Sequence, residues 1–440
     1  MLIAGAAAAA VVWLWPLAET TAPTITLEPA LDYIPAHVAL KVNVQERGSG
    51  LREVVVSISQ GQHTFVLAKR EFPPAALLEK GPGTLALELE ISPLKLGLVD
   101  GPATIEVMAR DRALYNWGEG NITRIERKVV VDTTAPKLNV LNGVVYMSRG
   151  GSAAAVYTCE GAVASGVSVG KWQFLGREWK AGGKLKLCLF AWPLEVPSGT
   201  QVWVWARDAA GNTTRLPLAV RLRPLKAPLF KIRLNDNLLK RLVQRMASHL
   251  PPGLASRLPT AFKWINEQLR KANHQQIRAV TSQAPTPRRW KGALLRPPGA
   301  TTALFGERRV YIYGGEVLTR SVHLGVDLAH TSHCIIKAAG AGRIIFAGPL
   351  GIYGNCVIVD HGLGLATLYG HLWQITVKEG QQIHRGQPIG RSDSTGLALG
   401  DHLHFSVLVG GVFVNPREWW DPSWVQAHVL APAGASTGER

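Results

Sequence analysis

The residues best suited to chemistry are histidines in the C-terminal third of the chain. His323 stands four residues before Asp327, and a His-x-His pattern follows at His402 and His404, with His371 alone between them. Side chains alternate along a strand, so His402 and His404 are expected on one face of a sheet. A hydrolytic zinc ion needs three nitrogen or oxygen ligands and one open position for water.

His323, Asp327 and one member of the His402 and His404 pair supply those three ligands. The other member and His371 are then free to move protons near neutral pH, for which imidazole is suited. The chain has no His-Glu-x-x-His motif, so the carboxylate base of the helical zinc proteases has no candidate. The pattern predicts a metallohydrolase.

Clustering strengthens this interpretation, because eight of the thirteen histidines lie between His323 and His404. A lone His-x-His is more often a solvated strand face. The remaining histidines of the cluster are expected on loops or in local hydrogen bonds. They are His330, His333, His361 and His384. Of these, His330 stands close enough to Asp327 to be a weak alternative ligand.

Five segments carry a resemblance to a known family. They are HLGVDLA (323–329), AAGAGRIIFAG (338–348), YGNCVIVDHGLGLATLYGHL (353–372), VKEGQQIHRGQPIGRSDSTGLALGDHLHF (377–405) and NPREWWD (415–421). In this order, they resemble the catalytic domain of the lysostaphin/LytM-type zinc endopeptidases, which cut peptidoglycan peptides. The resemblance covers residues 301–421, a little over a quarter of the chain.

The resemblance implies Zn²⁺ as the cofactor, with His323, Asp327 and His404 as ligands and His371 and His402 as the catalytic pair. Two positions depart from the family pattern. Ser406 stands where Glu is frequent and shares the strand face of the His-x-His pair, so it is expected to change hydrogen bonding around the metal. Asp401, where many members have Pro, places a carboxylate beside the catalytic pair.

The pattern of residues 301–421 agrees with a compact all-β domain of hairpins and a groove. Short β-branched or alternating runs at 343–347, 356–360, 374–377 and 404–409 are separated by glycine-rich turns. These glycine-rich turns do not form a phosphate cradle, and no nucleotide is expected.

A repeat precedes this domain. The run from Ile105 to Asp111 is echoed from Val202 to Asp208, each followed by Asn-x-Thr, and hydrophobic residues recur with period two through the first copy. We expect two β-sandwich modules, residues 24–133 (module 1) and 134–228 (module 2), which resemble the immunoglobulin-like (Ig-like) modules of bacterial surface proteins and would act in spacing or adhesion. The fold class is therefore mainly β.

Between the modules and the catalytic domain, residues 229–283 have helical periodicity. Asn235 or Asp236 can cap a helix whose apolar face packs inward or covers the groove of the enzyme and holds it inactive. The Pro- and Arg-rich residues 284–300 are expected to form an extended linker. Residues 422–440 form a tail, expected to be disordered from Val429 onward.

The N-terminal residues 1–18 contain an apolar stretch from Leu2 to Leu17, and the first charged residue is Glu19. We expect an uncleaved, single-pass membrane anchor, with a cleaved signal sequence or a buried helix as alternatives. Either membrane interpretation exports the remaining chain to the periplasm or the cell exterior. Cysteine usage fits export, because Cys159 with Cys188 and Cys334 with Cys356 can form disulfides within their domains; four buried thiols are the alternative.

Composition limits the partners. The 440 residues carry a formal charge of +17, which favours a polyanionic surface such as cell-wall polymer or anionic lipid. The basic residues are scattered and no nucleic-acid module stands out, so no nucleic acid is expected.

The sequence therefore predicts a membrane-tethered zinc metalloendopeptidase that hydrolyses peptide cross-links of peptidoglycan during cell-wall remodelling, with cell-wall or division proteins as further partners. The alternative is a catalytically inactive LytM-type regulator that activates a cell-wall amidase. Such regulators lack some metal ligands, whereas all five functional positions are filled here.

Overall fold

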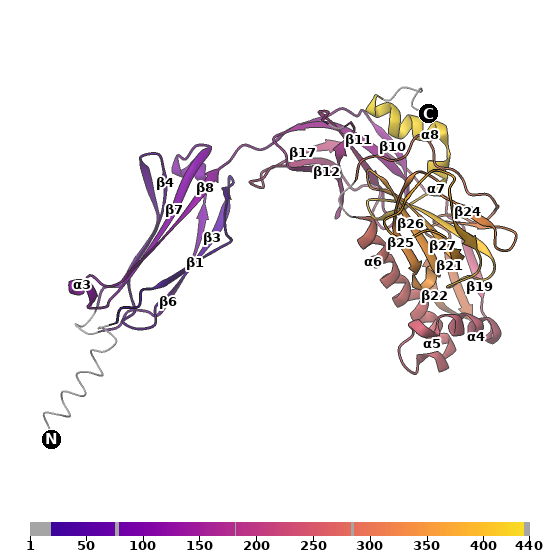
Figure 1. The fold of residues 1–440 in the computed structure, drawn as a ribbon, viewed down its shortest axis with the longest axis horizontal. Helices are drawn as coiled ribbons and strands as arrows, with labels where there is room; N and C mark the ends of the chain where they lie inside the picture. Colours follow the sequence, from indigo (N-terminus) through magenta and orange to yellow (C-terminus); the bar gives the residue numbers. More distant parts are fainter. Residues whose placement is uncertain (1–18, 75–78, 181, 283–285, 435–440) are drawn as a thin grey trace, which may run out of the picture. The chain divides into compact units, whose positions relative to one another are not determined.

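The computed structural model describes residues 19–74, 79–180, 182–282 and 286–434, and the chain forms two compact units. Unit 1 comprises Met1–Pro136 with Arg207–Thr213, and unit 2 comprises Lys137–Ala206 with Thr214–Arg440. Both consist mainly of strands (Figure 1). The mainly β class is therefore confirmed.

Unit 1 holds a core between two sheets of order β1-β3-β6 and β2-β8-β7-β4-β5. The elements are β1 (Thr24–Glu28), β2 (Tyr33–Ile34), β3 (Val38–Gln45), β4 (Leu51–Gln60), β5 (His63–Glu71), β6 (Thr84–Ile91), α2 (Pro93–Leu96), β7 (Gly101–Asp111), α3 (Tyr115–Gly118) and β8 (Ile122–Val131). Leu40, Val42 and Val44 of β3 are buried and the residues between them are not, as period-two alternation predicts.

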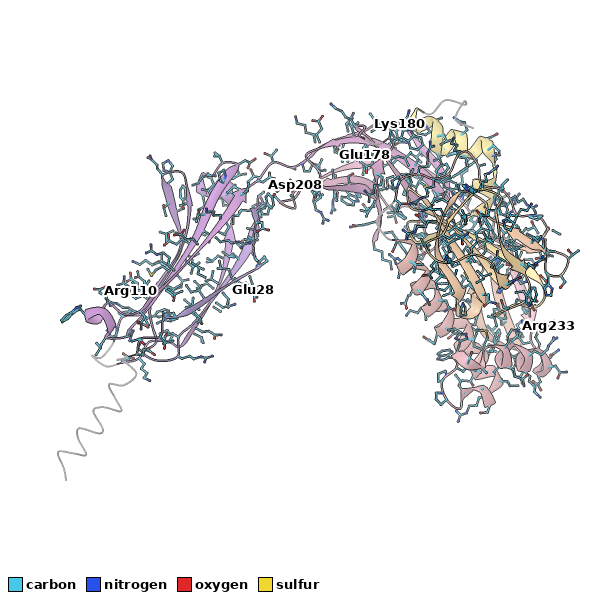
Figure 2. The ribbon with its side chains drawn as sticks, in the orientation of Figure 1. Glu28, Arg110, Glu178, Lys180, Asp208 and Arg233 are labelled. Carbon is cyan, nitrogen blue, oxygen red and sulfur yellow. The ribbon has the colours of Figure 1, made fainter. Side chains whose placement is uncertain are left out.

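The repeated motif makes the same contact in both copies. The carboxylate of Asp111 accepts hydrogen bonds from the backbone N–H (2.7 Å) and the side-chain amide (2.8 Å) of Asn121. The carboxylate of Asp208 accepts the equivalent pair from Asn212 at 2.8 and 3.0 Å. Asp208 directly follows its strand, β16 (Figure 2). The sequence repeat therefore has a structural counterpart.

The strands of module 2 form two four-stranded sheets, β14-β15-β11-β9 and β13-β12-β16-β17, and the parallel pair β10-β18. They are β9 (Lys137–Val140), β10 (Val145–Ser148), β11 (Ser152–Glu160), β12 (Ala164–Val169), β13 (Trp172–Leu175), β14 (Arg177–Glu178), β15 (Leu185–Ala191), β16 (Val202–Arg207), β17 (Thr213–Leu218) and β18 (Val220–Arg223).

A larger sheet of order β20-β23-β30-β27-β26-β25-β28 follows, with β24, β29 and β31 attached. Its strands are β20 (Ala300–Ala303), β23 (Val326–Ala329), β24 (Ile335–Lys337), β25 (Gly342–Pro349), β26 (Asn355–Gly362), β27 (Leu365–Ile375), β28 (Gln382–Ile383), β29 (Pro388–Ser392), β30 (His402–Val409) and β31 (Val412–Val414). A separate three-stranded sheet contains β19 (Leu229–Arg233), β21 (Arg308–Tyr313) and β22 (Glu316–Val322).

Module 2 is not a separate body, which differs from the expected boundary at residue 228. Its buried residues and those of the large sheet belong to one hydrophobic core. The indole N–H of Trp419 donates to Ser152 Oγ at 3.0 Å, and the backbone N–H of Ser152 donates to Glu418 at 3.1 Å. Six consecutive residues of β11 are buried, so both faces of this strand are covered. Module 2 and the large sheet therefore form one folded unit.

Residues 229–283 contain the expected helices but begin with a strand. β19 pairs in parallel with β21, and the helices α4 (Asp236–Arg245), α5 (Leu258–Trp264) and α6 (Arg270–Thr281) follow. Asn235 caps α4 by accepting a hydrogen bond from the N–H of Leu238. A π-helical turn, η4 (Ile265–Leu269), joins α5 to α6. The α5, η4 and α6 segments contact β22 and β25, so they pack against the catalytic strands (Figure 1).

Two segments expected to be free of the fold are packed onto it instead. In the expected linker 284–300, Trp290 and Leu294 are buried, and Arg289 forms an ion pair with Asp360 at 2.8 Å. The expected catalytic domain ends in α7 (Pro416–Trp420). The expected tail, residues 422–440, forms α8 (Pro422–Val425) and tight turns to Ala433, with Val429 and Leu430 buried. Expected disorder from Val429 is thus wrong as far as Ala433, because these side chains complete the core shared with module 2.

All four cysteines are free thiols, so neither expected disulfide forms. Cys188 and Cys356 are fully buried and behave as small apolar core residues. Within the described part of the chain, no helix is long and apolar enough to cross a bilayer. The expected anchor, residues 1–18, lies outside the described residues.

Candidate active site

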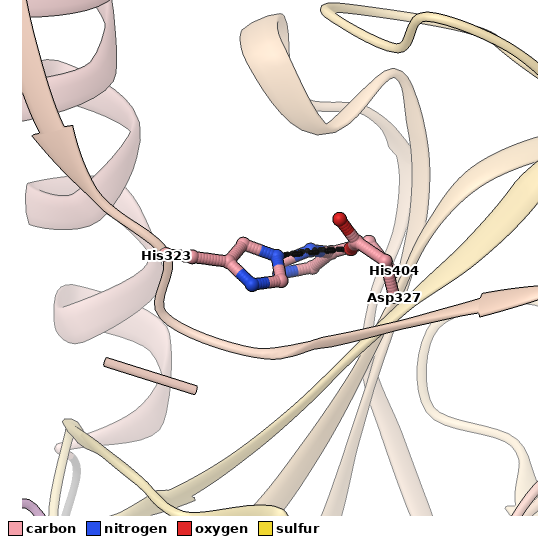
Figure 3. Close-up of side chains that lie close together, drawn as sticks. All are labelled: His323, Asp327 and His404. Atoms are coloured by element: carbon pink, nitrogen blue, oxygen red, sulfur yellow. Dashed lines mark hydrogen bonds and ion pairs between the residues drawn. The ribbon is translucent and has the colours of Figure 1, made fainter. Parts of the chain in front are cut away.

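Three side chains converge where β22, β23 and β30 meet. His323 directly follows β22, and Asp327 on β23 lies opposite His404 on β30 in the strand register. Asp327 Oδ1 lies 2.9 Å from both His323 Nε2 and His404 Nδ1, and these two nitrogens are 3.1 Å apart (Figure 3). These are the three residues that the sequence predicts as metal ligands. We call them the metal triad.

Hydrogen bonds on the far side of each imidazole of the metal triad determine which ring nitrogen carries the proton and which faces the centre. His323 Nδ1 lies 3.0 Å from the carbonyl oxygen of Leu304 and donates to it, which leaves the Nε2 lone pair bare. His404 Nε2 lies 2.9 Å from Ser406 Oγ, whose hydroxyl donates to the Leu324 carbonyl, so His404 donates to Ser406 and its Nδ1 is bare. Ser406 thus orients a triad histidine.

Asp327 has its own outer partner, which the sequence patterns do not indicate. Its Oδ2 accepts a hydrogen bond from Arg309 at 3.3 Å, and Arg309 also pairs with buried Glu307 at 3.0 Å. Oδ1 is thereby left facing the two imidazoles. Arg309 lies on β21 and Glu307 directly precedes this strand. The sequence does not indicate that the Arg309 side chain reaches Asp327 on β23.

A glycine lets the triad close. A Cβ on Gly325 would come within 2.6 Å of His404 Nε2 and 2.7 Å of the Phe405 carbonyl oxygen. Any other residue between His323 and Asp327 at this position would push the ring of His404 away. The glycine of the HLGVD segment is therefore a packing requirement of the site.

The metal triad has the donor set that zinc prefers. Three bare lone pairs directed at one another repel unless a cation lies between them. Tetrahedral ligands about 2.0 Å from zinc are roughly 3.3 Å apart, close to the separations of 2.9 to 3.1 Å found here. Two imidazoles and one carboxylate would hold the metal and leave a position for water. Other divalent ions accept the same donors.

His371 and His402 lie beside the metal triad. Their rings are 4.8 Å apart, and His402 Nε2 is 3.7 Å from Asp327 Oδ1. Each donates its Nδ1 proton to a carbonyl oxygen, His371 to Thr395 at 2.7 Å and His402 to Gly400 at 2.8 Å. Both Nε2 atoms are therefore available to exchange protons.

Backbone geometry also marks His371. Its φ is +62°, a left-handed conformation that non-glycine residues rarely adopt and that is often found at functional sites. The structure places His371 in the lining of the same pocket as the metal triad. Its catalytic role stays a prediction.

Burial lowers the pKa of two histidines, His404 and His371. It lowers the pKa of His404 to about 4, although Asp327 opposes the shift. Burial, together with the charges of His402 and His404, holds the pKa of His371 well below its ordinary value. A neutral His404 is the form that can bind a metal.

The pocket over the metal triad has a volume of about 370 Å³ and is partly lined from outside the expected catalytic domain. Strand β19 and its exit contribute Phe230, Ile232 and Leu234, and the helices contribute Leu242, Phe262 and Arg270. The helical segment packs inward, as one of the two expectations has it, and some of its residues line the pocket. That it holds the enzyme inactive stays a prediction. Which of its residues reach the pocket depends on the β19 and β21 pairing, for which the sequence gives no signal.

The other clustered histidines lie outside the metal triad. His330, the weak alternative ligand, is not among the three converging groups. His333 stacks on Trp373 with ring centroids 4.5 Å apart, and His361 is buried between the Ala341 carbonyl oxygen and a threonine hydroxyl. His384 is exposed. Asp401 accepts the backbone N–H of His333 and lines the pocket.

Comparison with known proteins finds matches to this region. The model of peptidase family M23 matches residues 321–416. The DD-carboxypeptidase/endopeptidase Mpg of Neisseria meningitidis is 39% identical over 98 residues, 22% of this chain and 23% of Mpg. The peptidoglycan DD-endopeptidase ShyA of Vibrio cholerae is 30% identical over 156 residues, 36% of this chain and 34% of ShyA.

A further match is the murein hydrolase activator EnvC of Escherichia coli, 34% identical over 107 residues, 24% of this chain and 26% of EnvC. Each match spans only about a quarter to a third of the relative. Among solved structures, an M23 peptidase from Pseudomonas aeruginosa, described as putative, gives a TM-score of 0.36 at 22% identity, covering 60% of this chain and 90% of that one. The lysostaphin catalytic domain from Staphylococcus simulans gives 0.24 at 29% identity, covering 28% and 92%.

Proposed function

We propose that the region of residues 321–416, which matches the model of peptidase family M23, is a zinc-dependent endopeptidase that hydrolyses peptide cross-links of peptidoglycan. The observation that carries this proposal is the metal triad with two further histidines whose Nε2 atoms are free. The relatives named as peptidoglycan endopeptidases support the substrate class.

His323, Asp327 and His404 would hold the ion, with Leu304, Arg309 and Ser406 fixing their orientation. When bound, zinc supplies a Lewis acid that acidifies water and polarises the scissile carbonyl group. The outer hydrogen bonds keep each donor atom aimed at the centre before the ion arrives, which lowers the cost of organising the site.

The two remaining histidines move the protons. Neutral His402 or His371 accepts a proton at Nε2 from the attacking water, and the other, protonated at Nε2, donates to the oxyanion that develops on the scissile carbonyl. The nitrogen that accepted the proton from the water then donates that proton to the departing amine, so the proton count balances. Both rings are held by carbonyl acceptors at Nδ1, so each transfer occurs at a single nitrogen.

We further propose that the chain acts at the cell envelope. The apolar residues 2–17 would tether it to the membrane, and the catalytic unit would then face the wall in the periplasm or outside the cell. Module 1, as a separately folded unit, is suited to spacing the site from the bilayer.

A second candidate function is activation of a separate cell-wall amidase, favoured by the match to EnvC. An activator would need neither the two catalytic histidines nor the three metal donors. All five residues are present here, which favours the endopeptidase. One experiment distinguishes the endopeptidase from the activator.

The test uses residues 19–440 and measures bound metal by mass spectrometry, together with peptide fragments released from purified peptidoglycan. We expect one zinc per chain and new peptide termini at cross-links. Asp327→Ala should lose both metal and hydrolysis, whereas His371→Ala should keep the metal and lose hydrolysis. His384→Ala, an exposed histidine outside the pocket, is the matched control and should retain both.

Hydrolysis by metal-free Asp327→Ala protein would disprove the zinc assignment. A wild-type protein that binds zinc, cleaves no peptidoglycan, and stimulates a purified amidase would establish the activator instead.

A further inference from the structure

Resting on the proposed endopeptidase function, we propose that Arg270 is a subsite for a carboxylate of the substrate, so that the enzyme selects peptides with a free carboxylate near the scissile bond. Arg270 is the first residue of α6 and lines the pocket of the metal triad together with Tyr353 and His404. It belongs to the helical segment, outside the matched residues 321–416.

The position of Arg270 suits a substrate longer than the pocket. Arg270 and Leu324 line both the pocket of the metal triad and a second cavity of about 520 Å³. Leu324 follows the metal ligand His323 directly. Arg270 is thus placed where a peptide with its scissile bond at the metal triad would meet it if the peptide extended toward the second cavity.

The guanidinium of Arg270 is fixed in place by a neutral partner. Its Nε and Nη2 donate to Asn266 Oδ1 at 3.2 and 2.8 Å. Asn266 is almost fully buried and donates in turn to Thr319 Oγ1 and the Arg320 carbonyl oxygen, both at 3.1 Å. Asn266 lies in the π-helical turn η4, a feature that is frequent at functional sites. The geometry is thus built to hold this side chain.

Charge is what distinguishes Arg270 from the other arginine that lines the pocket. Arg309 is neutralised by Glu307 and Asp327. Among the described residues, no carboxylate lies within ion-pair distance of Arg270. Its neighbour Glu267 is instead held by the hydroxyl of Thr319 at 2.8 Å. Arg270 is therefore a positioned cation without a counter-ion.

A partly buried guanidinium without an anion favours a ligand that supplies one. Its planar fork matches a carboxylate, and charge-assisted hydrogen bonds of this kind are about twice as strong as neutral ones. Nη1 has no hydrogen-bond partner among the described residues and is free to contact the ligand. The ligand class is accordingly a carboxylate-bearing peptide.

The test compares two synthetic cross-linked stem peptides that differ only in one group, a free carboxylate or its carboxamide. Full-length protein and the variants Arg270→Gln, Arg270→Lys and Lys263→Gln are assayed for kcat and KM on both. Lys263 is an exposed cation on α5 that lines neither cavity, so Lys263→Gln controls for the loss of one charge. Zinc content and thermal unfolding are measured for every variant.

We expect the wild-type enzyme to prefer the carboxylate peptide by about 10- to 100-fold in kcat/KM, mainly through KM. Arg270→Gln should remove this preference. The kcat/KM for the carboxamide peptide and the zinc content should stay unchanged. Arg270→Lys should keep part of it, and Lys263→Gln all of it. No preference in the wild type, or equal losses on both peptides in Arg270→Gln, would overturn the subsite.

Calorimetric binding of the two peptides to zinc-free protein separates this proposal from the proposed function. Arg270-dependent binding of the carboxylate peptide without any hydrolysis would keep the subsite and reject the endopeptidase. Hydrolysis of both peptides with equal binding and equal rates would keep the endopeptidase and reject the subsite.

Discussion

Module 1 and module 2 share a sequence motif but differ in what covers their strands. In module 1, β7 alternates between buried and partly exposed residues, and the core is complete within unit 1. In module 2, β11 is buried at six consecutive positions, and its core continues into the catalytic sheet. A sequence repeat therefore identifies two similar folds, whereas burial on both strand faces identifies which of them folds with its neighbour.

The largest effect should come from the contact between module 2 and α7. Trp419→Ala removes a fully buried indole and its hydrogen bond to Ser152, which should destabilise unit 2 by about 3–5 kcal/mol. Peptidoglycan hydrolysis should be lost at temperatures that the wild-type enzyme tolerates. Calorimetric unfolding measures the change, and Trp203→Ala, at an exposed tryptophan of β16, is the control. An unchanged unit 2 transition would contradict the shared core.

Substitution in the core of module 1 should leave the catalytic unit intact. Leu40→Ala should destabilise unit 1 by about 2–5 kcal/mol, with no change in hydrolysis of soluble peptides. Hydrogen exchange of the β4 amides reports unit 1, and Leu94→Ala, at an exposed leucine of α2, should have no effect. Loss of activity in Leu40→Ala would show that the two units do not fold independently.

Glu418 makes the stability of unit 2 depend on pH. Burial raises the pKa of Glu418 to about 7, although the N–H of Ser152 opposes the shift. The folded pKa exceeds the unfolded one, so this stabilisation is present below about pH 4.5 and lost as pH rises to about 7. The loss is on the order of 2 kcal/mol, allowing for partial solvent exposure.

Glu418→Gln should remove this part of the pH dependence of unit 2 unfolding. Glu316→Gln, at an exposed carboxylate of β22, should leave it in place. The measurement is the unit 2 unfolding temperature between pH 4.5 and 8. An identical pH profile in Glu418→Gln and wild-type protein would reject this role of the carboxyl group.

The smallest effect should come from the motif itself. Asn212 lies in the module 2 copy but is grouped with unit 1, and its side-chain amide donates to the Asp132 carbonyl oxygen at 2.8 Å. Asn212→Ala should cost unit 1 about 1 kcal/mol and leave unit 2 unchanged. Asn139→Ala, an exposed residue of β9, is the control. A shift in the unfolding transition of unit 2 alone would show that the Asn212 turn folds with unit 2 and not with unit 1.

Much of this fold follows from local patterns. Period-two alternation located β3 and β4, and the Asn235 cap with its apolar helix face located α4. The predictions of an extended linker and a disordered tail were wrong, because Trp290, Val429 and Leu430 are buried by residues that are distant in sequence. Short apolar stretches without periodicity do not reveal what covers them.

The metal triad was predictable because its residues occur in short motifs on strands. Its supporting shell was predictable only at Ser406, which shares a strand face with His404. Arg309 and Arg270 belong to segments outside the quoted motifs, and only tertiary pairing brings them to the pocket. Local sequence thus encodes the donors, whereas packing determines their environment.

The contact of Trp419 with Ser152 has a consequence for how such proteins can be recombined. A graft of residues 301–421 alone would carry an uncovered indole at its surface and expose the face that module 2 protects. The smallest transferable piece of this chain therefore begins near residue 137, and module 1 is the part that gene fusion could exchange without rebuilding the catalytic fold.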